Sequence, residues 1–351
     1  MRNVYSAKYR AFAGLAVVML FSIPASFCAA APYSDAVLAN NPVLYWQLNE
    51  TSGTTAVNTG TGLAPLNGTY VNIPGNGTTN VSNYGQAGPQ PVLFSGFEST
   101  NRAVLFDPEN TATTSTSTTN PGVQLASSSG SALAFSSAVT LEAWIYRNAQ
   151  ETTNSNNSEG IVSRFVGNVG GGAVSQRSYV LYYDANATPS TGNNAAGGGT
   201  IGASSGGTGA IGFQVSSTGA NVSTSNVYST VNIPLGEWTH LAAVFDGTSQ
   251  TMSLYINGLL NQSIADQVLG RTVPATLYTG DSIFQVGTQF GQNNPFVFEG
   301  AVDEVAVYGS ALSGGAILGN YQAAFVPEPT GLALAAMGLV GLTAARRRSK
   351  R

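Results

Sequence analysis

Cysteine is almost absent from this chain, and lysine is absent from its long central part. The single cysteine of the 351 residues, Cys28, lies in an N-terminal apolar segment. If that segment is removed, the remaining chain has no thiol, which excludes disulfides, cysteine metal sites and a cysteine nucleophile. Stability must then come from a buried core, and residues 31–325 are enough for one large core.

Positive charge is also scarce. Between residues 31 and 326 there are five arginines and sixteen acidic residues, which leaves a net charge of −11. Such a body lacks the positive surface that phosphate backbones require, so nucleic acid is excluded as a partner. It also repels anionic lipid headgroups, which argues against peripheral membrane binding by charge.

The N-terminus has the order of a secretory signal. Three basic residues precede the apolar run 11–23, and alanines follow near the end of the segment. This order predicts a signal peptide over residues 1–30, removed by signal peptidase. A lipidated Cys28 is the alternative, but the bulky Phe27 before it differs from the small residue that such sites normally have.

The C-terminus is apolar and then basic. Residues 332–345 are apolar or small, and five basic side chains follow: Arg346, Arg347, Arg348, Lys350 and Arg351. A stable span normally needs about 20 apolar residues, so this transmembrane helix is short. Its basic end would stay on the cytoplasmic side, with the body outside. An ordinary single-span anchor is one interpretation.

Pro327, Glu328 and Pro329 stand directly before this apolar stretch. Together with Arg346, Arg347 and Arg348, they resemble the PEP-CTERM sorting signal of exported bacterial proteins, over residues 326–351. The resemblance implies recognition and cleavage by a membrane exosortase in bacteria that make extracellular polysaccharide. We therefore expect an exported protein that is transiently anchored and then released into the envelope, the extracellular matrix or the medium.

The apolar residues of the body alternate as strands do. In residues 139–146, Val139 and every second residue after it are apolar. Asp246-Gly247 and Asn257-Gly258 then supply tight turns. Expected strands are residues 43–48, 139–146, 179–183, 211–215, 238–245, 252–256, 283–286 and 302–308. Helical periodicity is absent from the body, apart from a short turn over 311–321.

Many short strands with turns between them favour an all-β sandwich of two antiparallel sheets in a jelly-roll style. Polar loops at 110–120, 148–159 and 184–209 separate the strands. Loops of this length are commonly functional or mobile. No repeat at a fixed period is evident, so residues 31–325 form one domain with insertions.

Six blocks resemble the laminin G-like, concanavalin A-like domain, and they occur in that family's order. They are PVLYWQLNETSG at 42–53, LEAWI at 141–145, GEWTHLA at 236–242, LYING at 254–258, FEGAVDEVAVY at 298–308 and ALS at 311–313. The resemblance implies a concanavalin A-like jelly roll. It leaves function open, since the same sandwich serves lectins, adhesion modules and some hydrolases.

Catalysis is not expected. The one histidine, His240, shares a strand face with Trp238, and no nucleophile-elbow pattern accompanies it. Its place in the family block implies a structural role, as it does for Trp144, Trp238 and Gly258. Paired carboxylates are the other route, but Glu142 stands alone on its strand. Adjacent Asp303 and Glu304 are expected on opposite faces.

Binding of a structural calcium ion is a better explanation than catalysis for two acids, Asp303 and Glu50. Alternation places Glu50 on one face with Leu44, Trp46 and Leu48, and Asp303 on one face with Val305 and Val307. A buried unpaired charge is costly, and calcium accepts carboxylate oxygens flexibly. The alternative is that Asp303 caps backbone N–H groups and that Glu50 is solvated.

The ligand is unknown from sequence. A surface glycan or extracellular polysaccharide is the expected partner, and five aromatics could stack on sugars, although tyrosines in β-rich chains mostly pack within strands. They are Tyr182, Tyr183, Tyr228, Tyr278 and Phe290. We therefore expect a non-enzymatic, exported glycan-binding or partner-binding protein. The alternatives are a glycoside hydrolase on the same scaffold and a passive acidic matrix protein.

Overall fold

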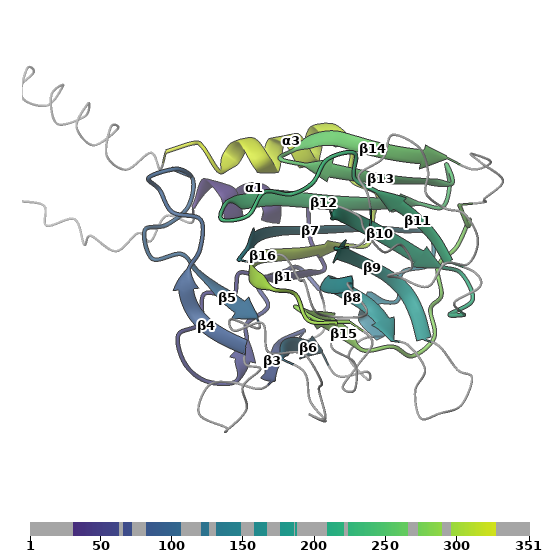
Figure 1. Cartoon of the computed structure of the whole chain (residues 1–351), viewed down its shortest axis with the longest axis horizontal. Coiled ribbons are helices and arrows are strands. Elements are labelled where there is room, and N and C mark those ends of the chain that lie inside the picture. Colours follow the sequence, from purple (N-terminus) through teal and green to yellow (C-terminus); the bar gives the residue numbers. More distant parts are fainter. Residues whose placement is uncertain are drawn as a thin grey trace, which may run out of the picture.

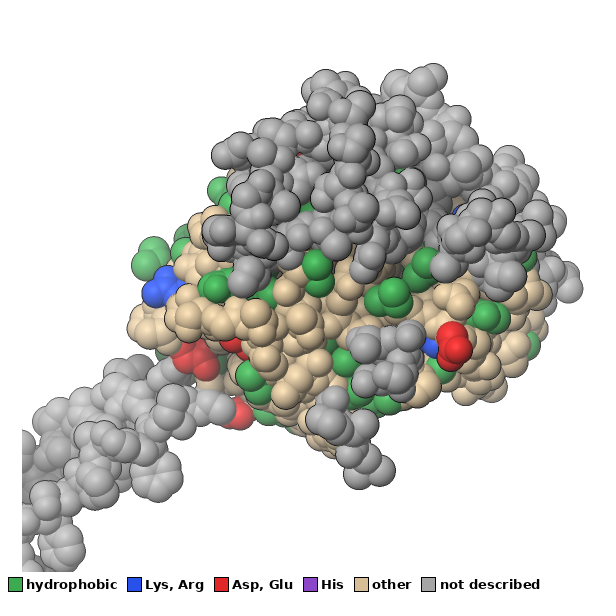
Figure 2. Space-filling model, turned by 90° about the horizontal axis from the view of Figure 1, so that it is seen from below, with side chains coloured by type: hydrophobic (Ala, Val, Ile, Leu, Met, Phe, Trp, Pro, Cys, Tyr) green, Lys and Arg blue, Asp and Glu red, His purple; other side chains and the backbone are tan. Residues whose placement is uncertain are grey.

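In the computed structural model, the chain forms two antiparallel sheets packed face to face (Figure 1). The structure describes residues 31–62, 66–71, 82–106, 121–125, 131–148, 158–166, 176–185, 187, 209–220, 224–265, 273–289 and 296–327. The expected all-β sandwich is confirmed. On the face shown in Figure 2, the described surface carries few charged side chains, as expected for a chain in which 9% of residues are charged.

The first sheet holds seven strands in one path, and β1 pairs with β16 beside it. In order, they are β14 (Leu259–Ala265), β13 (Thr251–Ile256), β12 (Trp238–Asp246), β7 (Ala138–Arg147), β16 (Gly300–Tyr308), β5 (Arg102–Phe106) and β4 (Ser82–Ala87), with β1 (Leu44–Trp46). The second sheet is ordered β11 (Thr224–Tyr228), β10 (Ala210–Ser216), β9 (Gln176–Asp184), β8 (Ser158–Val166), β15 (Phe284–Val286), β6 (Gly122–Leu125), β3 (Gly68–Val71) and β2 (Thr55–Ala56).

The main core lies between the sheets and uses the apolar residues that alternation predicted. Leu141, Ala143 and Ile145 of β7 point into it, together with Val305 and Val307 of β16. A smaller cluster lies on the outer face of the first sheet, where α1 (Pro32–Ala39) and α3 (Gly314–Ala323) cover Trp144 and Tyr308. A one-turn helix, η2, spans Ser131–Leu133.

Helix α1 is a correction, because the sequence showed no helical period there. A proline at the first helical turn suits the N-terminus of a helix, and eight residues are too few for periodicity to be visible. Helix α3 bears out the expected turn near 311–321, and Ser313 caps it by accepting a hydrogen bond from the Ala316 N–H at 3.2 Å.

A second correction concerns β16. Between Asp303 and Ala306 its pairing with β7 shifts by one residue, and Glu304 has a φ of 54°. This β-bulge inserts an extra residue, so Asp303 lies opposite Trp144 on the outer face, while Val305 and Val307 face the core. The expected common face for these three residues is therefore wrong.

Candidate functional site

A groove lies on the outer face of the first sheet, beside the area that the two helices cover. Its floor is a row of side chains across four strands, because Trp238 pairs with Tyr146, Tyr146 with Ala301, and Ala301 with Leu105. Directly opposite residues of antiparallel strands share a face. The small Ala301 in mid-row leaves a hollow between the larger neighbours.

The end of β4 and the segment that follows it form the wall of the groove. They contribute Gln86, Ala87, Gly88, Gln90, Val92, Leu93 and Phe94, and Asn148 completes the lining, around a volume of about 480 Å³. The Trp238 and Tyr146 rings are 5.6 Å apart and tilted by 55°. No charged side chain of the described residues lines the groove. Aromatic faces with a few amides suit binding of an uncharged ligand.

Asp303 and Glu304 lie behind the groove, in the bulge. The Asn101 amide donates to Asp303 Oδ2 at 2.8 Å, and the Tyr45 hydroxyl donates to Glu304 Oε2. Both carboxyl groups are buried. Burial raises the pKa of Asp303 well above its ordinary value, and burial together with the Asp303 charge does the same for the pKa of Glu304.

Two further oxygens in this region are buried without a hydrogen-bond partner among the described residues, Glu98 Oε2 and Asn101 Oδ1. The Glu98 charge contributes to the raised pKa values of both bulge carboxyl groups. Gly88 belongs to the groove and to this region, since a Cβ there would lie 2.6 Å from Asp303 Oδ2. We call Asp303, Glu304, Glu98 and Asn101 the carboxylate cluster.

Glu50 does not join the carboxylate cluster through a contact. One of its oxygens accepts the Tyr70 hydroxyl at 2.6 Å and the other accepts the Val57 N–H at 2.8 Å. Burial and this hydrogen bond raise the pKa of Tyr70. Among the residues that the structure describes, no three His, Cys, Asp or Glu side chains are arranged to hold a metal ion. A calcium ion would therefore depend on amide or carbonyl oxygens as well.

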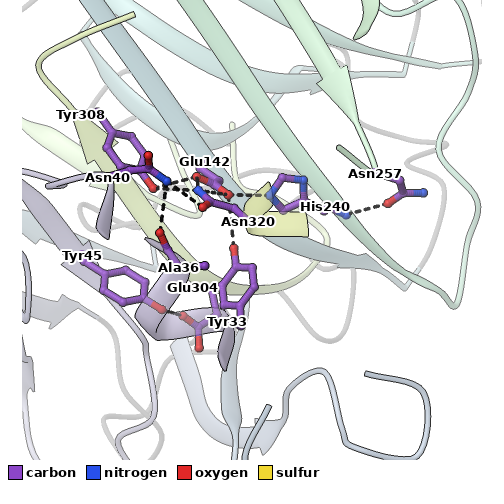
Figure 3. Close-up of polar contacts among 10 residues, drawn as sticks. All are labelled: Tyr33, Ala36, Asn40, Tyr45, Glu142, His240, Asn257, Glu304, Tyr308 and Asn320. Atoms are coloured by element: carbon purple, nitrogen blue, oxygen red, sulfur yellow. Dashed lines mark hydrogen bonds and ion pairs between the residues drawn. The ribbon is translucent and has the colours of Figure 1, made fainter. Parts of the chain in front are cut away.

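His240 and Glu142 form a buried polar network under the helices (Figure 3). Glu142 Oε1 lies 2.7 Å from His240 Nε2, and Glu142 Oε2 accepts the Tyr308 hydroxyl at 2.8 Å and the Asn320 amide at 2.9 Å. All four side chains are buried. The network ties β7, β12, β16 and α3 together, and its burial leaves no room for a substrate.

The remaining residues expected to be structural lie around the same helices. Trp144 is buried, with Phe94 edge-on at 4.9 Å and His240 at 5.4 Å between ring centroids. Gly258 has a φ of 75°, and a Cβ there would lie 2.7 Å from the Tyr321 Cβ. Trp238 differs, because it lines the groove and is only half-buried.

A family model for the laminin G type of the concanavalin A-like lectin/glucanases superfamily matches residues 116–318, more than half of the chain. The chain belongs to this family. No curated protein matches it. Tyr146, Trp238, Ala301, Asp303 and Glu304 lie within the matched range, whereas the groove wall, Glu98 and Asn101 lie before it.

Several solved structures are similar to this chain at low sequence identity. Domain 4 of an extracellular arabinanase from Geobacillus stearothermophilus, in complex with arabinotriose, is 15% identical, with 80% of this chain and 98% of that chain covered and a TM-score of 0.45. A sialidase module of Ruminococcus gnavus, bound to sialyllactose, is 16% identical, with 56% and 90% covered and a TM-score of 0.39. A pentraxin of Limulus polyphemus is 14% identical, with 52% and 70% covered and a TM-score of 0.32.

The aromatics that the sequence offered for sugar stacking lie elsewhere in this laminin G-like domain. Tyr182 and Tyr183 are buried in β9, and the Tyr182 hydroxyl donates to the half-buried Tyr228 hydroxyl at 2.8 Å. Tyr278 is half-buried outside the groove. Phe290 lies outside the described residues. Alternation in the strand 139–146 could have indicated Tyr146, which falls on the face opposite the core.

The residues of the expected sorting signal lie almost wholly outside the described part of the chain, which ends at Pro327. Glu328, Pro329, Arg346, Arg347 and Arg348 are therefore not placed. Within the described ranges, no helix has both the length and the apolarity needed to cross a membrane.

Proposed function

We propose that this protein is an exported, non-catalytic glycan-binding protein and that the groove is its binding site. The observation that carries the proposal is the row from Trp238 to Leu105, which places two aromatic rings beside a hollow at Ala301. Sugars have apolar C–H faces that stack on such rings, while the amides of Gln86, Gln90 and Asn148 are suited to the hydroxyl groups. The family supports the proposal, since it includes lectins.

The lining also favours one ligand class. None of the described residues that line the groove is charged, so it has no partner for a uronate, sulfate or sialate group. The acidic body opposes such anions further. We expect neutral sugars, and those with extra apolar groups such as acetyl or methyl, to bind best.

A glycan array with the purified chain tests the proposal, followed by titration of the best neutral ligand. Trp238 is half-buried whereas Trp46 and Trp144 are fully buried, so ligand binding should change the emission of Trp238. Trp238→Ala should abolish array binding, and Val57→Ala, on the second-sheet side of the chain, should leave it unchanged. Equal binding by wild type and Trp238→Ala would refute the groove as the site, and no binding to any glycan would favour a passive acidic matrix protein.

The enzymatic alternative needs two carboxyl groups facing each other across a glycosidic bond. No carboxylate of the described residues lines the groove, and Glu142 is buried under the helices. A reducing-end assay on polysaccharide tests this alternative directly. Release of reducing ends by the wild type, with loss of activity in a groove variant, would overturn the non-catalytic assignment.

We also propose a structural calcium ion at the carboxylate cluster. Of the two expected calcium ligands, Asp303 and Glu50, this proposal keeps Asp303. The unpartnered Glu98 Oε2 and Asn101 Oδ1 beside Asp303 fit a cation that prefers oxygen ligands. Glu50 fits less well, since both of its oxygens already accept hydrogen bonds. Calcium should raise the melting temperature relative to a chelator, and Asp303→Asn should remove this increase.

The two ends complete the proposed route of the protein. Signal peptidase removes residues 1–30, and the C-terminal segment holds the body at the membrane until an exosortase processes it. The body then enters the envelope or the polysaccharide matrix. Deleting residues 327–351 should abolish envelope association, and unchanged association would refute a sorting role for the segment.

A further inference from the structure

Four large apolar side chains are exposed close to both ends of the described chain. Val92, Leu93, Phe325 and Val326 are 93%, 73%, 42% and 50% exposed. We call these four residues the apolar patch. An exposed cluster of this kind on a soluble domain usually marks an interaction surface.

Hydrogen bonds to main-chain carbonyl oxygens hold the two halves of the apolar patch together. The Ser95 hydroxyl donates to the Phe325 carbonyl oxygen at 2.7 Å, and the Gly96 N–H donates to the Ala324 carbonyl oxygen at 2.8 Å. A Cβ on Gly96 would lie only 1.9 Å from the Ala323 carbonyl oxygen, so only glycine permits this approach. The Phe94 and Phe325 rings lie 5.5 Å apart.

The N-terminal end of the body lies at the same place, because the Tyr33 N–H donates to the Gly96 carbonyl oxygen at 3.2 Å. The chain beyond Val326 leads within six residues to the apolar stretch that begins at Leu332. Six residues span at most about 20 Å when fully extended. The apolar patch is therefore within reach of any bilayer surface that holds the stretch.

We infer that the apolar patch rests on the lipid surface and orients the tethered body there. This inference depends on the proposed membrane role of the C-terminal segment. Apolar side chains such as Phe, Leu and Val enter the headgroup boundary by burying apolar area and need no positive charge. The acidic body alone would not bind, so the tether supplies the proximity and the apolar patch supplies the orientation.

The orientation has a consequence for the groove, because Val92 and Leu93 belong both to its wall and to the apolar patch. In the tethered state the groove would lie along the membrane, with its wall against the lipid. Processing of the C-terminal segment would free this wall. Tethered and released forms should therefore differ in access to large glycans.

Fluorescence quenching in vesicles of neutral phosphatidylcholine tests the inference with the full chain. In a Cys28→Ser background the chain has no other thiol, so Leu93→Cys takes a single environment-sensitive fluorophore. Val57→Cys is the matched control, an exposed apolar position next to β2 of the second sheet. Brominated lipids should quench the fluorophore at position 93 and leave the one at position 57 unquenched.

A second variant replaces the half of the apolar patch that lies outside the groove lining. Phe325→Asp with Val326→Asp should abolish quenching at position 93, while the chain still floats with the vesicles and stays folded at the temperature of the assay. Some loss of melting temperature is expected, because the Phe325 ring packs on Phe94 and Tyr321. Flotation without quenching at position 93 in the parent would overturn the inference and leave tethering intact. Failure of flotation would refute the membrane role of the segment as well. Shielding that depends on protein concentration and not on bromine would identify a second copy as the occupant, which also overturns the inference.

Discussion

The outer face of the first sheet contains two different surfaces that lie two residues apart on the same strands. On β7, Trp144 is buried under the helices, while Tyr146 lies in the open groove. On β12, His240 is buried and Trp238 is half-buried in the groove. The same alternation places all four residues on this face. What separates the structural from the proposed binding residues is the cover by the two helices and by Phe94 and Phe97.

The covered surface contains a polar network whose members depend on one another. Glu142 accepts hydrogen bonds from Tyr308 and Asn320 and contacts His240. Buried polar groups need such partners because water is excluded. In the groove, water or a ligand can take this place for the amides of Gln86 and Asn148, while the Gln90 amide donates to the Asn101 carbonyl oxygen at 2.8 Å.

The largest expected effect is on the covered surface. Glu142→Ala leaves four buried polar side chains without their common partner and should lower the free energy of unfolding by about 3–5 kcal/mol; they are Tyr33, His240, Tyr308 and Asn320. Urea denaturation measures it. Glu142→Gln, which keeps an acceptor oxygen, is the control and should cost less. Equal stability of wild type and Glu142→Ala would show that the network contributes nothing.

Truncating the two tryptophans compares the surfaces directly. Trp144→Ala removes a fully buried ring and should cost about 3–5 kcal/mol of stability. Trp238→Ala should cost less than half of that, because its ring is half-buried, yet it should abolish glycan binding. Denaturation and titration of both variants give the comparison. Loss of binding in Trp144→Ala while it remains folded would contradict the division.

Gly88 tests the close packing between the groove wall and the carboxylate cluster. Gly88→Ala brings a Cβ to 2.5 Å from Asn101 Nδ2 and 2.6 Å from Asp303 Oδ2, and such overpacking costs about 1–3 kcal/mol. Gly319→Ala in α3 is the control, and its expected change in stability has the opposite sign. Nothing lies within 4 Å of its added Cβ, and alanine should stabilise the helix by about 0.5–1 kcal/mol. Thermal melts that show the same shift for both would contradict this account.

The last expected effect is a pH dependence of stability. The pKa values of Asp303 and Glu304 are raised above their ordinary 3.8 and 4.5 by burial, so the folded state binds more protons than the unfolded state. In chelator, their contribution to stability is therefore greatest at low pH and falls as pH rises through the folded pKa values. Stability curves of Asp303→Asn and wild type, measured in chelator at increasing pH above 3.8, isolate the contribution of Asp303, and curves that stay parallel would contradict it.

Much of the fold could be predicted from alternation and turns. Residues 139–146 and 238–245 were expected as strands and fall within β7 and β12. Short edge elements such as β2 and helix α1 gave no periodic signal, because two to eight residues are too few to show one. The bulge at Glu304 could not be predicted either. Val305 and Val307 after it alternate as in a regular strand, so the sequence pattern does not show the inserted residue.

The candidate site was only partly predictable. Asp303 was identified as an acid near a buried surface, and its burial bears this out, but its neighbours Glu98 and Asn101 come from a distant segment. Tyr146 and Trp238 were visible as strand residues, and nothing near them in sequence distinguished them from Trp144 and His240. Which outer-face residues stay open depends on where α1 and α3 lie.

By itself, the sequence determined an acidic, thiol-free body built of alternating strands, because side-chain period and composition are local properties. The tertiary structure decided which half of one sheet face is covered by helices and which is a groove. It also brought residues 92–96 against residues 323–326. Those outcomes depend on contacts between residues from 109 apart in the sequence, as for Tyr33 and Glu142, to 230 apart, as for Ser95 and Phe325, and no local pattern encodes such contacts.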